Sequence, residues 1–204
     1  MNKENWLSQL ESSVWNNWYI LIPVALGLWV ISVYNKIIKL SVSADRAWHD
    51  IDTVLKQRVD MIPNLVEIVK GYAKHESETL TKVIEARSKV SQMNIDIKNA
   101  TPAQMAAFQS AQGEMSQMLG KLFALSESYP DLKANQNFMA LQSDLKTLED
   151  KLNHSRRYYN GVVKNFNEAI LVFPSNVIAK MFGFKERQYF EINEKDRENV
   201  KIKF

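Results

Sequence analysis

The sequence contains no cysteine. This absence excludes a disulfide framework, a thiol nucleophile and a metal site built on thiolates. Glycine and proline are scarce, with 6 and 5 residues in a chain of 204. The glycines are isolated from one another, so the chain has no glycine-rich loop that could bind phosphate. Long segments without these helix breakers, rich in Leu, Ala, Lys, Glu and Gln, predict an all-α protein.

Charge of either sign is missing from one stretch, between Glu11 and Lys36. Within it, the segment Trp18–Tyr34 is almost wholly apolar and has aromatic residues near both ends. A bilayer core needs about 20 helical residues, and this run reaches that length with its uncharged neighbours at 15–17 or 35. Pro23 and Gly27 carry no charge and are tolerated in membrane helices. We therefore predict one transmembrane helix near the N-terminus.

Two alternatives to a membrane span are a buried core helix and a cleaved signal peptide. A core helix of this length without one charge is rare in so small a chain. A signal peptide could be cleaved at the small residues of 42–44, but it would need a basic start. The leader instead carries Glu4 and Glu11 and only Lys3. Both alternatives are therefore less favoured than a retained anchor.

Basic residues follow the apolar run at Lys36, Lys39 and Arg46, whereas the leader has only Lys3. By the positive-inside rule, the leader lies outside and the remainder of the chain lies in the cytoplasm. The net charge of the whole chain is +3, and Lys and Arg are scattered among Asp and Glu. A nucleic-acid binder concentrates its basic residues on one face, so no nucleic-acid partner is expected.

Apolar residues recur at helical spacing through most of the remaining chain. Trp48, Ile51, Leu55, Val59 and Ile62 predict a first stripe, with Arg58 among the charged residues facing water. Pro63 predicts a kink or break near 61–64, where Asn64 would cap a second helix that fades at 93–100. The stripe of this second helix contains Leu65, Val69, Tyr72, Leu80, Val83, Ile84 and Val90.

Two more helices follow. Thr101, Pro102 and Gln104 form a capping-box pattern that predicts a helix start, and Ser128–Asp131 predicts a turn. The segment from about 132 to 172 then has a coiled-coil-like heptad seam, with apolar residues at alternating steps of three and four. Its positions are Phe138, Leu141, Leu145, Leu148, Leu152, Ser155, Tyr159, Val162, Phe166 and Ala169.

Such a seam cannot be buried by one helix alone. We predict an N-terminal transmembrane helix, then a long antiparallel up-and-down bundle of about four helices, then a short C-terminal helix ending at Gly183. The expected segments are a polar leader at 1–17, the transmembrane helix and its exit at 18–40, the bundle at 41–172, a short aromatic and amphipathic segment at 173–190, and a charged tail at 191–204.

Candidate chemistry is sparse. His75 and Glu76 resemble the first half of a zinc-binding His-Glu-x-x-His motif, but position 79 is Thr. His49 and His154 lie among charged neighbours, and paired Glu-x-x-His motifs for a di-metal site are missing. We therefore assign no catalytic, metal-binding or cofactor-binding residue and expect no cofactor.

The segment 177–190 is too apolar for a free tail. One interpretation is that it lies on anionic lipid, since Lys180, Lys185 and Arg187 accompany its apolar residues. The other, which we favour, is that its aromatic residues fold back and cap one end of the bundle. The candidate interaction residues are Ile178, Met181, Phe182, Phe184, Tyr189 and Phe190.

Several motifs in this chain resemble the signature of the bacterial LemA family. They are the long run Ala47–Arg87, the exit Val33–Asn35, and the runs Tyr129–Leu132, Arg156–Asn160, Phe173–Asn176 and Phe182–Phe184. The resemblance covers about residues 30 to 190. It implies a single-pass protein of the bacterial inner membrane with a long antiparallel helical bundle. The family has no established catalytic activity, so the resemblance assigns no functional residues.

These observations favour an interaction or scaffold module at the cytoplasmic face of that membrane. Its partners would be the lipid bilayer and an unidentified membrane protein, for which the resemblance suggests a membrane protease. A homo-oligomer is also left open. Two alternatives remain: an organiser of lipid or envelope structure that acts through the aromatic segment, and a hydrolase with an unrecognised site.

Overall fold

A computed structural model of the chain describes residues 18–190, and every regular element in that range is a helix. The long helices are α2 (Trp18–Tyr72), α3 (Ser77–Ser91), α4 (Pro102–Leu125) and α6 (Gln136–Leu171). The short ones are the 3₁₀-helix η1 (Ser126–Ser128), α5 (Pro130–Lys133) and α7 (Ser175–Met181). The predicted all-α class and the long apolar N-terminal helix are confirmed. The expected leader at 1–17 and tail at 191–204 lie outside the described residues.

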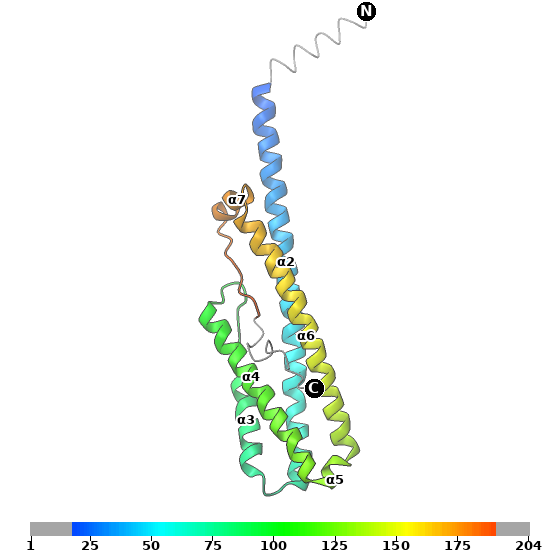
Figure 1. Cartoon of the computed structure of the whole chain (residues 1–204). Coiled ribbons are helices and arrows are strands. Elements are labelled where there is room, and N and C mark those ends of the chain that lie inside the picture. Colours follow the sequence, from blue (N-terminus) through cyan, green and yellow to red (C-terminus); the bar gives the residue numbers. More distant parts are fainter. Residues whose placement is uncertain (1–17, 191–204) are drawn as a thin grey trace, which may run out of the picture.

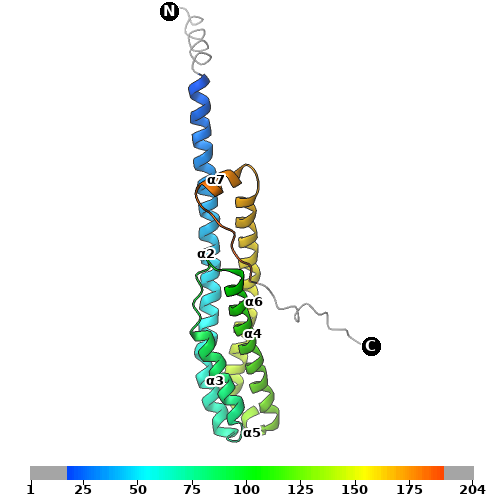
Figure 2. The ribbon, with the colours of Figure 1, turned by 90° about the vertical axis from the view of Figure 1, so that its left-hand side faces the viewer.

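The long helices run alternately up and down, and α2 extends far beyond the others at its N-terminal end (Figure 1). Helix α2 packs mainly along α6, and α3 packs mainly along α4. The pair α3–α4 covers only the part of α2 farthest from its N-terminus (Figure 2). We call the N-terminal part of α2, which begins with the apolar run Trp18–Tyr34, its apolar half. Near this part of the helix, the bundle therefore consists of α2, α6 and α7.

The predicted break at Pro63 is wrong, because α2 continues through this residue to Tyr72. A proline inside a helix removes the N–H that would bond the carbonyl four residues earlier. Here that carbonyl belongs to Val59, and the Nε atom of Arg87 on α3 donates to it at 3.2 Å. A neighbouring helix thus satisfies the acceptor that Pro63 leaves open. The chain turns instead at residues 73–76.

Two positions of the second predicted stripe are not buried. Tyr72 and Ile84 were expected on the buried stripe, but they are 43% and 50% exposed. Ala73 and Val83 are buried beside them, and Leu80, Val83 and Val90 of the same stripe are buried as predicted. In contrast, the capping box at Thr101 and Gln104 is confirmed, with the Thr101 hydroxyl accepting from the Gln104 N–H at 3.2 Å.

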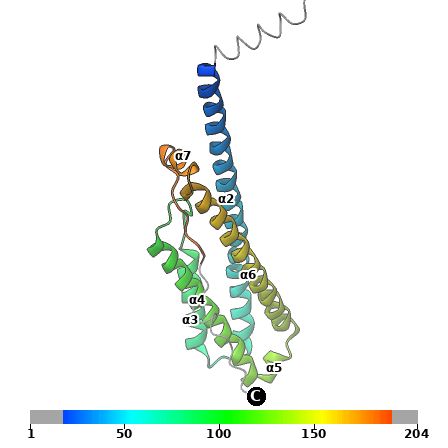
Figure 3. The ribbon, with the colours of Figure 1, turned by 45° about the horizontal axis from the view of Figure 1, so that its top comes forward.

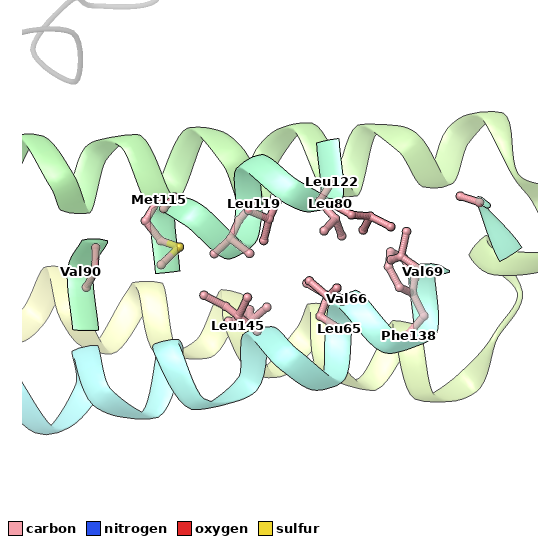
Figure 4. Close-up of a cluster of buried hydrophobic side chains, with 14 of the residues drawn as sticks. Leu65, Val66, Val69, Leu80, Val90, Met115, Leu119, Leu122, Phe138 and Leu145 are labelled. Atoms are coloured by element: carbon pink, nitrogen blue, oxygen red, sulfur yellow. The ribbon is translucent and has the colours of Figure 1, made fainter. Parts of the chain in front are cut away.

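Three apolar clusters are stacked along the bundle. In the cluster farthest from the apolar half of α2, Leu65 and Val69 of α2 face Leu119 and Leu122 of α4 and Leu145 of α6 (Figure 4). The middle cluster contains Trp48, Phe108 and Tyr159. The third consists of Ile37, Phe166, Ile170 and Ala179. The seam of α6 contributes to all three.

The predicted seam matches the buried face of α6 as far as Tyr159, and beyond that residue the buried face is shifted at two positions. Phe138, Leu145, Leu148, Leu152, Tyr159 and Phe166 are buried as expected, whereas Leu141 and Ser155 are only half-buried. Near the C-terminal end of α6, Val163 and Ile170 are buried in place of Val162 and Ala169. A straight α-helix has 3.6 residues per turn, so its buried face moves away from a strict heptad.

Arg58 was expected to face water, but its exposed fraction is 4%. Its Nη2 atom donates to Ser116 Oγ of α4 at 2.8 Å, and its Nη1 atom lies 3.2 Å from Glu149 Oε2 of α6. Burial lowers the pKa of the Arg58 guanidinium, and the nearby Glu149 carboxylate partly opposes that shift. Arg58 thus forms a polar layer that joins three helices.

Candidate functional site

The end of the bundle beside the apolar half of α2 is built from α7 and the residues around it (Figure 3). The ring of Phe182 lies 4.6 Å from that of Tyr34 on α2, and the ring of Phe184 lies 6.0 Å from it. The chain reverses at Gly183, whose φ of 72° is a conformation that glycine adopts without steric cost. The start of the bundle is therefore level with the last residue of the apolar run.

This end of the bundle exposes a group of large apolar side chains, which we call the apolar tip. Its members, with their exposed fractions, are Leu171 (55%), Val172 (59%), Phe173 (77%), Val177 (49%), Met181 (72%) and Phe182 (53%). Ile178 and Ala179 on the opposite face of α7 are buried and hold the helix against the bundle. The tip is thus a fixed surface on a packed element.

After Gly183 the chain runs back along α6 without helical structure, and we call residues 184–190 the C-terminal strap. Two asparagine side chains of α6 hold it. Asn167 accepts from the Arg187 N–H and donates to the Arg187 carbonyl, both at 2.9 Å. Asn160 makes the same pair of bonds with the backbone of Phe190, both at 2.8 Å. Each amide therefore satisfies both polar backbone groups of one strap residue.

The spacing of these asparagines matches the strap. Seven residues of helix rise about 10.5 Å, and three residues of extended chain span about 10 Å. Asn160 and Asn167 can therefore pair with residues 190 and 187 without straining either segment. Tyr159 adds a third contact by donating its hydroxyl to the Gln188 carbonyl at 2.9 Å. Burial raises the pKa of the Tyr159 phenol, which keeps this donor protonated.

Two strap side chains enter the bundle. Arg187 is 5% exposed, and its guanidinium donates to Asp45 Oδ1 at 2.7 Å and to Ser41 Oγ at 2.9 Å on α2. Phe190 is 1% exposed and lies 6.1 Å from the ring of Trp48, with the Arg156 guanidinium 4.5 Å from its own ring centre. The strap therefore ties α2 to α6.

The six candidate interaction residues fall into two groups. Ile178 and Phe190 are buried, and Phe184 is half-buried against the third cluster. Met181, Phe182 and Tyr189 are exposed, the last by 41%. An interaction through the exposed group stays a prediction.

Sequence reasoning missed the roles of Asn160, Asn167 and Arg187. The available signal was a pair of asparagines seven residues apart on the buried side of α6. Asn167 is 5% exposed, and a buried amide needs partners for both its donor and its acceptor. An extended backbone segment supplies both.

Groups that could carry chemistry do not converge. His49, His75 and His154 are exposed, and residues 18–190 hold no group of three His, Asp or Glu side chains placed to bind a metal ion. A polar depression of about 490 Å³ is lined by side chains of α6 alone, among them Glu149, His154 and Arg157. Among the polar motif residues, Tyr159 and Asn160 bind the strap.

Comparison with known proteins decides the family. A sequence profile described as the LemA family matches residues 47–204, which is more than half of the chain. The chain belongs to the LemA family.

Three known proteins are similar in sequence to this chain. The chain is 28% identical over 145 residues to "Protein LemA" of Metamycoplasma hominis, covering 71% of this chain but only 63% of that protein. It is 23% identical over 189 residues to "Magnetosome protein MamQ 2" of Paramagnetospirillum magneticum, covering 84% of this chain and 70% of the relative. With "Magnetosome protein MamQ" of Magnetospirillum gryphiswaldense it shares 22% over 188 residues, or 84% and 69% of the two chains.

The LemA-like motifs of this chain have structural roles. Residues of the run Arg156–Asn160 bind the strap through hydrogen bonds and a cation–π contact. The chain changes direction within Phe182–Phe184, where the Phe182 ring packs against Tyr34. Tyr129 donates its hydroxyl to Glu76 at 3.3 Å and so links the loops at the far end of the bundle. The family and an N-terminal helix long and apolar enough to cross a bilayer fit a membrane-associated protein.

Proposed function

We propose that this LemA-family protein is a single-pass membrane protein whose bundle is an interaction or scaffold module at the cytoplasmic face of the bacterial inner membrane. One observation supports this most directly: the apolar segment and the central helix of the bundle are one uninterrupted helix, α2. A module joined to its anchor by a flexible linker would reorient freely. A continuous helix would hold the bundle at a defined angle and height above the bilayer, which suits a scaffold.

The long exposed sides of the bundle offer positions at which this function can be tested. Ile84 on α3 and Met139 and Tyr158 on α6 are large apolar or aromatic side chains that are about half exposed or more, and they lie well away from the tip. Single exposed apolar residues are normal on a monomer, so they mark positions to test rather than a defined interface. A membrane protein, such as a membrane protease, or a second copy of the chain would bind along these sides.

Photo-crosslinking in living cells tests the scaffold. A photoreactive amino acid would replace Ile84, Met139 or Tyr158 singly in the full chain, with Lys74 as an exposed polar control. We expect one discrete protein adduct from at least one apolar position and none from the control. Equal, diffuse adducts from all four positions would contradict a scaffold.

The proposed orientation has its own test, because the chain has no native cysteine. A cysteine at Ser8 should react with a membrane-impermeant thiol reagent in intact cells. A cysteine inserted after Lys195 should react only once the membrane is opened. The reverse pattern would overturn the cytoplasmic placement of the bundle and leave the anchor intact.

A further inference from the structure

We propose that the apolar tip is seated in the headgroup region of the same bilayer that α2 crosses, with nearby lysines facing anionic lipid. This inference rests on the proposed membrane span. It adds a second, interfacial contact to the anchor and names its partner as anionic lipid.

The length of the apolar segment places the tip at the correct depth. A span of about 20 residues that includes all of Trp18–Tyr34 must end between Tyr34 and Ile37. Tyr34 contacts the ring of Phe182, and Ile37 is fully buried in the cluster with Ala179 of α7. Whichever limit holds, the hydrocarbon boundary falls beside α7. The bundle is therefore too close to the bilayer for its end to lie in bulk water.

Exposure along α2 changes at the same level. Large apolar residues from Tyr19 to Trp29 are exposed, as is Ile31, whereas Val30, Val33 and Tyr34 are half-buried. Lipid can therefore surround α2 up to about Ile31, and protein replaces lipid immediately after it. The tip begins where the lipid-accessible surface of α2 ends, so the two apolar surfaces are continuous.

The exposed apolar residues outside the span are concentrated at this end. Between Val42 and Tyr189, half of the large exposed hydrophobic residues fall within 171–182. The opposite end of the bundle exposes Tyr72 among charged residues such as Lys74, Glu127 and Lys133. A soluble surface has no reason to segregate its exposed side chains in this way, whereas a bundle standing on a membrane does.

The charges around the tip complement anionic headgroups. Lys36 and Lys39 on α2 and Lys180 and Lys185 around α7 are exposed at this level. Of the nearby acidic residues, Glu168 Oε1 lies 3.6 Å from Lys164 Nζ, which offsets its charge, and Glu186 is exposed directly beside Lys185. Aromatic side chains next to lysines are typical of segments that lie in the interface.

Depth measurement by spin labelling tests the proposal in the full chain reconstituted in phosphatidylcholine vesicles containing phosphatidylglycerol. A nitroxide would be attached through a single cysteine at Phe173 or Met181, with Leu26 as the span control and Tyr158 as the water control. Collision with lipid-soluble oxygen would be compared with collision with a water-soluble nickel complex. We expect the oxygen-to-nickel ratio at 173 and 181 to exceed that at 158 severalfold and to approach that at 26.

Ratios at 173 and 181 equal to that at 158, with a lipid-like value at 26, would overturn the inference and leave the membrane span intact. A water-like ratio at 26 would overturn the span itself. Spin–spin broadening at 181 that disappears on dilution with unlabelled protein would assign the tip to a second copy and also overturn the inference.

The lipid charge is tested with a double variant, Lys180→Gln with Lys185→Gln, against Lys146→Gln with Lys151→Gln as matched controls on the side of α6. We expect phosphatidylglycerol to raise the oxygen-to-nickel ratio at Met181 in the wild-type chain and in the control pair. The tip double variant should lose this increase. The same increase in all three proteins would show that the lysines do not recognise anionic lipid.

Discussion

Leu145 and Lys146 are adjacent on α6 but differ strongly in burial, so substitutions at the two positions should have different effects on stability. Leu145 is 5% exposed within the cluster farthest from the apolar half of α2, whereas Lys146 is exposed. Leu145→Ala should lower the free energy of unfolding by about 2–5 kcal/mol, because it removes buried methyl groups and leaves a cavity. Lys146→Ala should change it by less than about 0.5 kcal/mol.

Urea unfolding of the chain in mild detergent, followed by circular dichroism, measures this difference. Small and equal losses from the two variants would mean that the seam of α6 does not pack within its own chain. The seam would then have to face another protomer.

A second effect at the residue scale concerns Arg58. Its guanidinium is buried between Ser116 and Glu149, and the Glu149 side chain is 39% exposed. Glu149→Gln removes the opposing charge but keeps the shape, so it should destabilise the bundle by about 1–3 kcal/mol. Arg58→Met removes the buried charge itself and should cost less than Glu149→Gln. Chemical unfolding of both variants checks this order, and the reverse order would show that Arg58 contributes mainly through packing.

At the scale of the element, the continuity of α2 depends on a contact from another helix. Pro63→Ala restores the N–H that can bond Val59, and it should stabilise the protein by about 1–3 kcal/mol. Arg87→Ala should cost about 1 kcal/mol in the wild-type chain, where the Val59 carbonyl loses its partner. In the Pro63→Ala background the same change should cost much less.

A double-mutant cycle on these two positions measures the coupling directly. Strictly additive effects would show that Arg87 does not replace the hydrogen bond that Pro63 removes.

The strap is the other element whose position depends on side chains far away in the sequence. Asn167→Ala leaves the Arg187 N–H and carbonyl without partners in a buried position, which should cost about 2 kcal/mol or more. Hydrogen exchange should accelerate at the amides of the strap and remain slow around Leu152 in the middle of α6. Asn153→Ala, on the exposed side of the same helix, is the matched control. Unchanged exchange in the strap would mean that Asn160 and Arg187 hold it without Asn167.

At the scale of the whole molecule, one continuous helix connects the apolar segment to the bundle. The large apolar side chains from Ile20 to Trp29 are exposed along this helix. Lipid is the environment that removes them from water. The protein should therefore remain in the membrane fraction after alkaline carbonate washing and should migrate at full length. A soluble product that starts near Asp45 would indicate cleavage and contradict the anchor.

The features that the sequence by itself determined depend on interactions between residues close together in the chain. The uncharged run before Lys36, the capping box at Thr101 and the stripe on α6 each depend on residues within a few turns of one another. Hydrophobic periodicity, capping and length are therefore sufficient to predict an all-α chain with an apolar N-terminal helix. The same reasoning correctly predicted that Leu145, Leu148 and Leu152 are buried, because a heptad pattern and a straight helix stay in phase over a few turns.

Long-range contacts decided the rest. Pro63 would end an isolated helix, but Arg87 of α3 satisfies the acceptor it leaves open, so α2 continues. Arg58 looks like a surface residue until Ser116 and Glu149 are brought beside it. The strap is positioned by Asn167, and the tip packs against Tyr34. Both residues are distant in sequence from the residues they contact. Such partners become neighbours only when the helices pack, so no local pattern contains them.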